Sequence, residues 1–141
     1  MFEEMIADYL AKLKGHCPNV KSVILFGSVA RGEAHRDSDV DLIVVATGLP
    51  ELKERHELPP FSKPARIQDI WMTQEELEDM VAAKTGFVMD ALLEGKVLQD
   101  DGTAARAREK LVGSLKRLKA RRLKEGWLIP GDDLRRGIAF D

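Results

Sequence analysis

Residues 24–45, ILFGSVARGEAHRDSDVDLIVV, decide how we expect this chain to fold. The apolar run at the start of this stretch predicts a buried strand over Val20–Phe26, and Gly27 is placed to end it. Ser28 is placed to cap a short helix over Val29–Arg31. The stretch therefore begins as a strand, a glycine-serine turn and one helical turn.

Two carboxylates open a second strand, which we expect over Leu42–Ala46. Because side chains alternate between faces along a strand, Asp39 and Asp41 are predicted to point the same way and Val40 the other. Adjacent carboxylates repel each other, and they are costly to bury unless a cation neutralises them. Their hard oxygen ligands on a rigid strand favour Mg²⁺ or Mn²⁺ over zinc.

The glycine-serine turn has the properties of a phosphate-binding loop. Gly27 lets a phosphate approach the backbone closely, and the N–H groups at the start of the following helix attract anions. Ser28 adds a hydroxyl donor, while Arg31 and Arg36 flank the turn within reach of a triphosphate. The stretch thus offers a phosphate site beside a metal site, as transfer from a nucleoside triphosphate requires.

Gly27-Ser28, ten residues, and then Asp39-Val40-Asp41 resemble the signature of the polymerase-beta-type nucleotidyltransferase superfamily. Inside it, Ala30-Arg31-Gly32 and Ser38-Asp39 are similar to its minimal nucleotidyltransferases, which include the MNT antitoxins paired with HEPN-domain toxins. The resemblance extends more loosely to about residue 100. Alternating helices and strands predict an α/β domain with a small mixed β-sheet flanked by helices, which is the fold that the resemblance implies.

A third carboxylate is expected from a strand predicted over Ala65–Met72. Asp69 lies on an otherwise apolar face of that strand, where an acidic side chain needs a reason. In the resembled family a carboxylate from the neighbouring strand completes the metal site, so the resemblance implies that Asp69 joins Asp39 and Asp41. Asp69 would help activate the attacking hydroxyl through a metal or accept its proton. The alternative is a carboxylate at a strand end that meets solvent or a lysine.

The resemblance implies nucleotidyl transfer, with ATP as substrate and AMP as the group that is moved. The site residues that follow from the motif are nucleotide-binding Gly27, Ser28, Arg31 and Ser38, and catalytic and metal-binding Asp39, Asp41 and Asp69. The acceptor implied by the resemblance is a tyrosine of a HEPN-domain toxin, which would make the chain an antitoxin. Two alternatives stay open: a non-catalytic antitoxin that neutralises its partner by occlusion, and a nucleic-acid-binding protein.

The composition is ordinary for one globular domain of 141 residues, with 44% hydrophobic and 33% charged side chains. We expect a core domain over residues 1–100 and an extension over residues 101–141. The net charge of -2 gives no general attraction to nucleic acid or membrane, and no apolar run is long enough to span a bilayer. A single cysteine, Cys17, fits a reducing, cytoplasmic setting. The oligomeric state stays open.

The remaining core elements follow from hydrophobic spacing and capping signals. They are a helix over residues 2–14 ended by Gly15, a short helix over Glu51–Leu58, a helix from Gln74 behind a capping box at Thr73, a helix over about Thr85–Leu93, and a short strand over Lys96–Gln99.

A basic helix is predicted to begin at Thr103, as its cap, and to run to about Lys124. Its basic residues are Arg106, Arg108, Lys110, Lys116, Arg117, Lys119, Arg121, Arg122 and Lys124. Most such charge runs are solvated faces, and the functional alternative is a surface for an acidic partner or RNA, which would bind with strong salt dependence. Gly126–Asp141 is expected to be a packed arm or an interaction tail.

Overall fold

The structure is a computed structural model that describes residues 2–118, 121–123 and 126–128. Its elements, in chain order, are α1 (Phe2–His16), β1 (Val20–Phe26), α2 (Gly27–Ala30), β2 (Val40–Ala46), the 3-10 helix η1 (Leu52–Glu57), β3 (Ile67–Met72), α3 (Gln74–Ala82), α4 (Gly86–Glu94), β4 (Lys96–Asp100), α5 (Thr103–Leu118), β5 (Arg121–Leu123) and β6 (Gly126–Leu128). Among the described helices, none is long and apolar enough to cross a membrane.

The main sheet has four strands in the order β3-β2-β1-β4. β1 is antiparallel to both β2 and β4, while β3 runs parallel to β2. The sheet is therefore mixed, and the predicted α/β fold is confirmed. β5 and β6 pair with each other in a separate two-stranded sheet.

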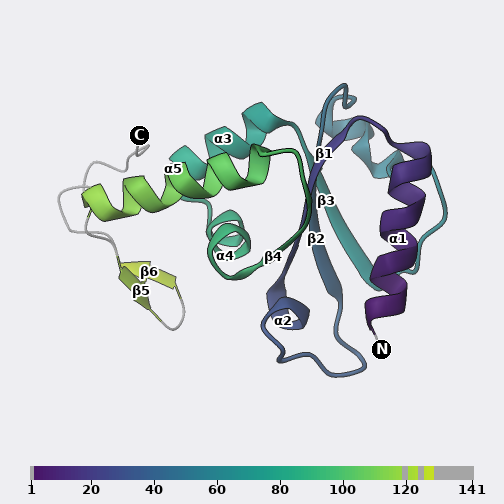
Figure 1. The fold of residues 1–141 in the computed structure, drawn as a ribbon, viewed down its shortest axis with the longest axis horizontal. Coiled ribbons are helices and arrows are strands. Elements are labelled where there is room, and N and C mark those ends of the chain that lie inside the picture. The colour runs from purple at the N-terminus through teal and green to yellow at the C-terminus, as the bar shows by residue number, and fades with distance from the viewer. Residues whose placement is uncertain (1, 119–120, 124–125, 129–141) are drawn as a thin grey trace.

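Helices cover both faces of the main sheet, with α1 on one side and α3, α4 and α5 on the other (Figure 1). Burying a large aliphatic side chain contributes about 1.5–3 kcal/mol, so these two layers hold the sheet. The α1 face buries Tyr9, Leu13, Val23, Leu25, Val40, Leu42, Val44, Ile67 and Trp71. The opposite face buries Ile24, Ile43, Val45, Met72, Leu77, Val81, Val88, Leu92, Leu111 and Leu115.

The turn after β1 differs from its sequence prediction by two residues. α2 begins at Gly27, and the residue that precedes it, Phe26, makes no side-chain capping hydrogen bond. Ser28 therefore lies inside α2 and does not cap it, so that prediction is wrong. Gly27, with φ of 77°, turns the chain directly out of β1, and the helical turn follows this residue without a gap.

The predicted basic helix ends six residues early, at Leu118, and a strand occupies Arg121–Leu123. Its apolar stripe stops at Leu118, and a helix without an apolar stripe gains little from packing. The predicted basic residues Lys119 and Lys124 lie outside the described residues, as does the predicted tail beyond Leu128.

The cap of α5 is supplied by two aspartates and not by the Thr103 side chain. The Asp101 carboxylate accepts hydrogen bonds from the Thr103 hydroxyl at 2.6 Å and from its backbone N–H at 3.0 Å. These bonds lower the pKa of Asp101 to about 2, the hydroxyl having the larger effect. Asp100 accepts from the N–H groups of Ala104 and Ala105.

β3 is an edge strand whose outer carbonyls are bound by two basic side chains. Lys63 Nζ donates to the Ile67 carbonyl oxygen at 2.7 Å, and Arg55 Nη1 donates to that of Trp71 at 3.4 Å. Arg55 also pairs with Glu76 at 2.6 Å. These contacts tie the segment between β2 and β3 to the sheet.

The predicted capping box at the start of α3 is confirmed. Thr73 Oγ1 accepts from the Glu76 N–H at 3.1 Å, and Glu76 Oε1 accepts from the Thr73 N–H at 2.8 Å. α4 offers a contrast, because Thr85 precedes it without a side-chain capping hydrogen bond.

We predict that Thr73→Ala lowers the free energy of unfolding by about 1 kcal/mol, since it leaves a helix N–H without its acceptor. Urea unfolding followed by circular dichroism measures this change. Thr85→Ala is the matched control and should cost clearly less. Equal losses in the two variants would contradict the capping argument.

Candidate active site

The turn after β1 is packed directly against the second strand. Phe26, the last residue of β1, lies opposite Asp41 in the β1–β2 register. A Cβ atom added to Gly27 would overlap Oδ2 of Asp41, and its φ of 77° is unfavourable for other residues. Glycine is thus required here for two reasons, the backbone conformation and the close approach of a carboxylate.

Asp39 and Asp41, which we call the carboxylate pair, flank Val40, the first residue of β2. Asp39 is exposed and Asp41 is half-buried. Burial raises the pKa of Asp41, and the nearby negative charge of Asp39 raises it further, while Arg31 acts in the opposite direction. The pair is therefore a place where added positive charge would be stabilising.

Arg31 follows α2 and lies among acidic side chains. Its Nε donates to Glu33 Oε1 at 2.7 Å, and this bond raises the pKa of Arg31. Asp90 and Glu94 of α4 act on it in the same direction over longer distances. Arg31 therefore stays charged beside the carboxylate pair, as a group that binds phosphate must.

Ser38 helps to form the tight turn that leads into the carboxylate pair. Its N–H donates to the His35 carbonyl oxygen at 2.9 Å, and its hydroxyl accepts from the His35 N–H at 3.0 Å. Arg66 donates to the carbonyl oxygen of Arg36, which joins this loop to the segment before β3. Ser38 thus has a structural role in presenting Asp39, and its predicted contact with a nucleotide stays a prediction.

Asp69 does not lie with the carboxylate pair, so the prediction that it completes the site is wrong. It is opposite Leu42 in the β2–β3 register, and it therefore shares the face covered by α1. Its carboxylate accepts hydrogen bonds from the Tyr9 hydroxyl at 2.5 Å and from Trp71 Nε1 at 3.0 Å. Lys63 Nζ lies 3.5 Å away, and the Asp69 side chain is only 6% exposed.

Gln68, which the sequence reasoning missed, takes the place beside Asp41. The two residues are opposite each other in parallel strands, and such residues share a face of the sheet. Strand periodicity separates residues 68 and 69 onto opposite faces, but it does not say which of them meets Asp41. That choice required the register.

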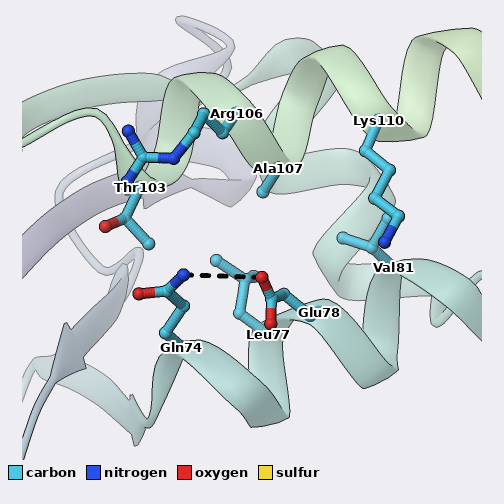
Figure 2. A pocket seen from close by; sticks show the side chains of 8 residues that line it. All are labelled: Gln74, Leu77, Glu78, Val81, Thr103, Arg106, Ala107 and Lys110. Atoms are coloured by element: carbon cyan, nitrogen blue, oxygen red, sulfur yellow. Dashed lines mark hydrogen bonds between the residues drawn. The ribbon is translucent and has the colours of Figure 1, made fainter.

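A small pocket lies between α3 and α5, away from the carboxylate pair (Figure 2). Figure 2 shows Gln74 and Glu78 on one side, joined by a 3.4 Å hydrogen bond, and Arg106 and Lys110 on the other. Its volume of about 100 Å³ is well below the roughly 300 Å³ at which ordinary ligand pockets begin. We therefore do not assign the nucleotide to this pocket.

The donor set at the carboxylate pair suits a hard divalent cation that is shared with a ligand. Within residues 2–118, 121–123 and 126–128, no group of three or more His, Cys, Asp or Glu side chains is arranged to hold a metal ion. Asp39 and Asp41 supply oxygen ligands, which Mg²⁺ and Mn²⁺ prefer, and Mg²⁺ commonly binds one or two carboxylates together with substrate phosphates. The pair fits that pattern.

Comparison with known proteins gives one family for this chain. The profile of the Nucleotidyltransferase domain matches residues 4–98. The protein adenylyltransferase MntA of Shewanella oneidensis is 31% identical in an alignment over 93 residues, and the alignment covers 63% of this chain and 63% of that protein. The alignment thus spans somewhat less than two thirds of this relative.

Solved structures show the same fold. A crystal structure of a toxin-antitoxin with AMP-PNP aligns with a TM-score of 0.55 and 19% identity, covering 80% of this chain and 88% of that chain. A structure of the tri-AMPylated Shewanella oneidensis HEPN toxin in complex with MNT antitoxin gives a TM-score of 0.52 and 15% identity, covering 84% of this chain and 90% of that chain.

We predict that Asp39→Asn lowers the pKa of Asp41 in the metal-free protein, because it removes a like charge. Carboxyl NMR titration measures this pKa. Because folding raises the pKa of Asp41, the protonated form of this side chain favours the folded state. This contribution to stability is complete below the unfolded pKa and is lost as the pH rises through the folded pKa. Asp41→Asn should therefore not lower the free energy of unfolding at neutral pH. If the pKa of Asp41 is unchanged in Asp39→Asn, the two carboxylates do not interact.

We predict that Tyr9→Phe lowers the free energy of unfolding by about 1–3 kcal/mol, since it removes a donor from a buried carboxylate. A double-mutant cycle with Asp69→Asn, measured by urea unfolding, isolates the coupling between the two side chains. Additive effects would show that the Tyr9–Asp69 hydrogen bond does not contribute to stability.

Proposed function

Because the chain belongs to the nucleotidyltransferase domain family, we propose that it transfers AMP from ATP to an acceptor hydroxyl. The observation that carries this proposal is the contact between the Gly27 turn and Asp41, which leaves no room for a Cβ at residue 27. It brings a turn suited to phosphate against a carboxylate suited to a cation. ATP is supported by the relatives, one of which is named as a protein adenylyltransferase and another of which is a complex with AMP-PNP.

The residues of the site would have distinct roles in this reaction. Gly27 and Ser28 would bind the β- and γ-phosphates, and Arg31 would offset their charge. Asp39 and Asp41 would hold Mg²⁺ or Mn²⁺. When bound, the cation supplies positive charge that stabilises the negative charge developing on the phosphate oxygens.

The chemistry is a displacement at the α-phosphorus of ATP. The acceptor oxygen forms a bond to this phosphorus, the bond to the bridging oxygen of the β-phosphate breaks, and pyrophosphate leaves. The acceptor proton would leave to solvent, and Gln68, the side chain beside Asp41 on β3, is an amide that would not accept it. The chain contributes by aligning the triphosphate with the acceptor, since holding two reactants in the correct geometry removes a large part of the barrier.

We propose a tyrosine of a HEPN-domain protein as the acceptor, which makes this chain an antitoxin. Support comes from the relative MntA and from the complex of an AMPylated HEPN toxin with an MNT antitoxin. Co-expression with a HEPN-domain protein, followed by mass spectrometry, would detect AMP on tyrosine. Neutralisation of that protein without AMP transfer would favour the occlusion alternative.

We predict that Asp41→Asn reduces AMP transfer by about 100-fold or more, because it removes charge that stabilises the reacting phosphates. Transfer of label from α-³²P-ATP to the partner measures the effect, with pyrophosphate release as a second readout. Asp37→Asn is the matched control, since Asp37 is an exposed loop carboxylate close by in the sequence, and it should remain active. Wild-type transfer by Asp41→Asn would remove the chemical basis of the proposal.

A further inference from the structure

Three neighbouring strands place Phe26, Asp41 and Gln68 in one row across the sheet. Neighbouring strands are about 4.8 Å apart, so Gln68 borders Asp41 on the side away from the Gly27 turn. Gln68 is exposed, and its Nε2 donates to the Ala65 carbonyl oxygen at 2.9 Å. A neutral amide therefore flanks the carboxylate pair at β3.

The packing of β3 prevents Asp69 from replacing Gln68 as the neighbour of Asp41. A one-residue shift of β3 would turn every one of its side chains to the opposite face. Ile67 and Trp71, now 0% and 7% exposed, would leave the core, and Asp69 would lose its bonds to Tyr9 and Trp71. The packing of the α1 face thus fixes Gln68 as the neighbour of Asp41.

We infer that the neutral side chain of Gln68 limits the cation site to two carboxylates, an inference that rests on the proposed function. Asp39 and Asp41 carry two negative charges, which one divalent cation balances. Arg31, which follows α2, is already paired with Glu33 at 2.7 Å, so the carboxylate pair and the cation are close to neutral by themselves. Since residue 68 adds no negative charge at β3, the remaining charged ligands of the cation would be phosphate oxygens.

The consequence is coupled binding of metal and nucleotide. Affinity for a hard cation rises with the number of charged ligands, so two carboxylates alone bind the cation weakly. A triphosphate adds the missing charge, and the cation in turn favours the triphosphate by the same free energy. Gln68 sets the strength of this coupling by contributing no charge of its own.

The test is Mn²⁺ binding, measured from the electron paramagnetic resonance signal of free Mn²⁺, with and without a non-hydrolysable ATP analogue. Gln68→Asp should tighten Mn²⁺ binding without nucleotide by about tenfold, because it adds a third carboxylate beside Asp41. Gln68→Asn, which keeps the neutral charge, should stay within about twofold of wild type. The analogue should tighten Mn²⁺ binding more in wild type than in Gln68→Asp.

Circular dichroism checks that each variant is folded. If Gln68→Asp does not fold, Gln68→Glu replaces it, and it too should bind Mn²⁺ more tightly than wild type. Equal Mn²⁺ affinity in the acidic and neutral variants would overturn the inference. Weakened Mn²⁺ binding in folded Asp69→Asn would also overturn it, because it would make Asp69 the third ligand. Equal Mn²⁺ affinity in wild type and Asp41→Asn would instead remove the cation site, and with it the proposed function.

Discussion

The register between β2 and β3 is the constraint on which the site depends. It sets Asp41 opposite Gln68 and Leu42 opposite Asp69. Gln68 therefore lies on the face of Asp41, and Asp69 lies on the opposite face, under α1. Val40 and Ile67, which are opposite each other and fully buried under α1, hold this register. The apolar packing of one face therefore determines which chemical groups meet on the other.

Local features of the site could be predicted from the sequence because they depend on few residues. The turn at Gly27 and the placement of Asp39 and Asp41 close after it follow from one strand-turn-strand unit, whereas the φ of Gly27 and its close approach to Asp41 came only from the structure. The strands and core helices were also predictable, since their apolar residues recur at the spacing of each element. This unit accounts for the specificity of the family motif.

The role of Asp69 could not be predicted in the same way, because its partner is distant in the chain. Tyr9 precedes it by 60 residues, and nothing in the spacing of β3 indicates that a helix hydroxyl will reach this carboxylate. Its burial is stabilised by Tyr9, Trp71 and Lys63 together. The role of a buried acidic residue on a strand thus cannot be assigned until the element that covers it is known.

The end of α5 could not be predicted for a related reason. The basic residues continue past Leu118, and charge patterning alone does not show where the helix stops packing against the core.

The basic side chains on the outer edge of β3 have a further consequence for the behaviour of the protein at high concentration. Edge strands with free carbonyl groups are templates for pairing with another molecule, and natural proteins often block them with charged side chains. Lys63 and Arg55 occupy carbonyls of Ile67 and Trp71, so an incoming strand would first have to displace both cations. The same contacts that join the β2–β3 connection to the sheet therefore also protect this edge against aggregation.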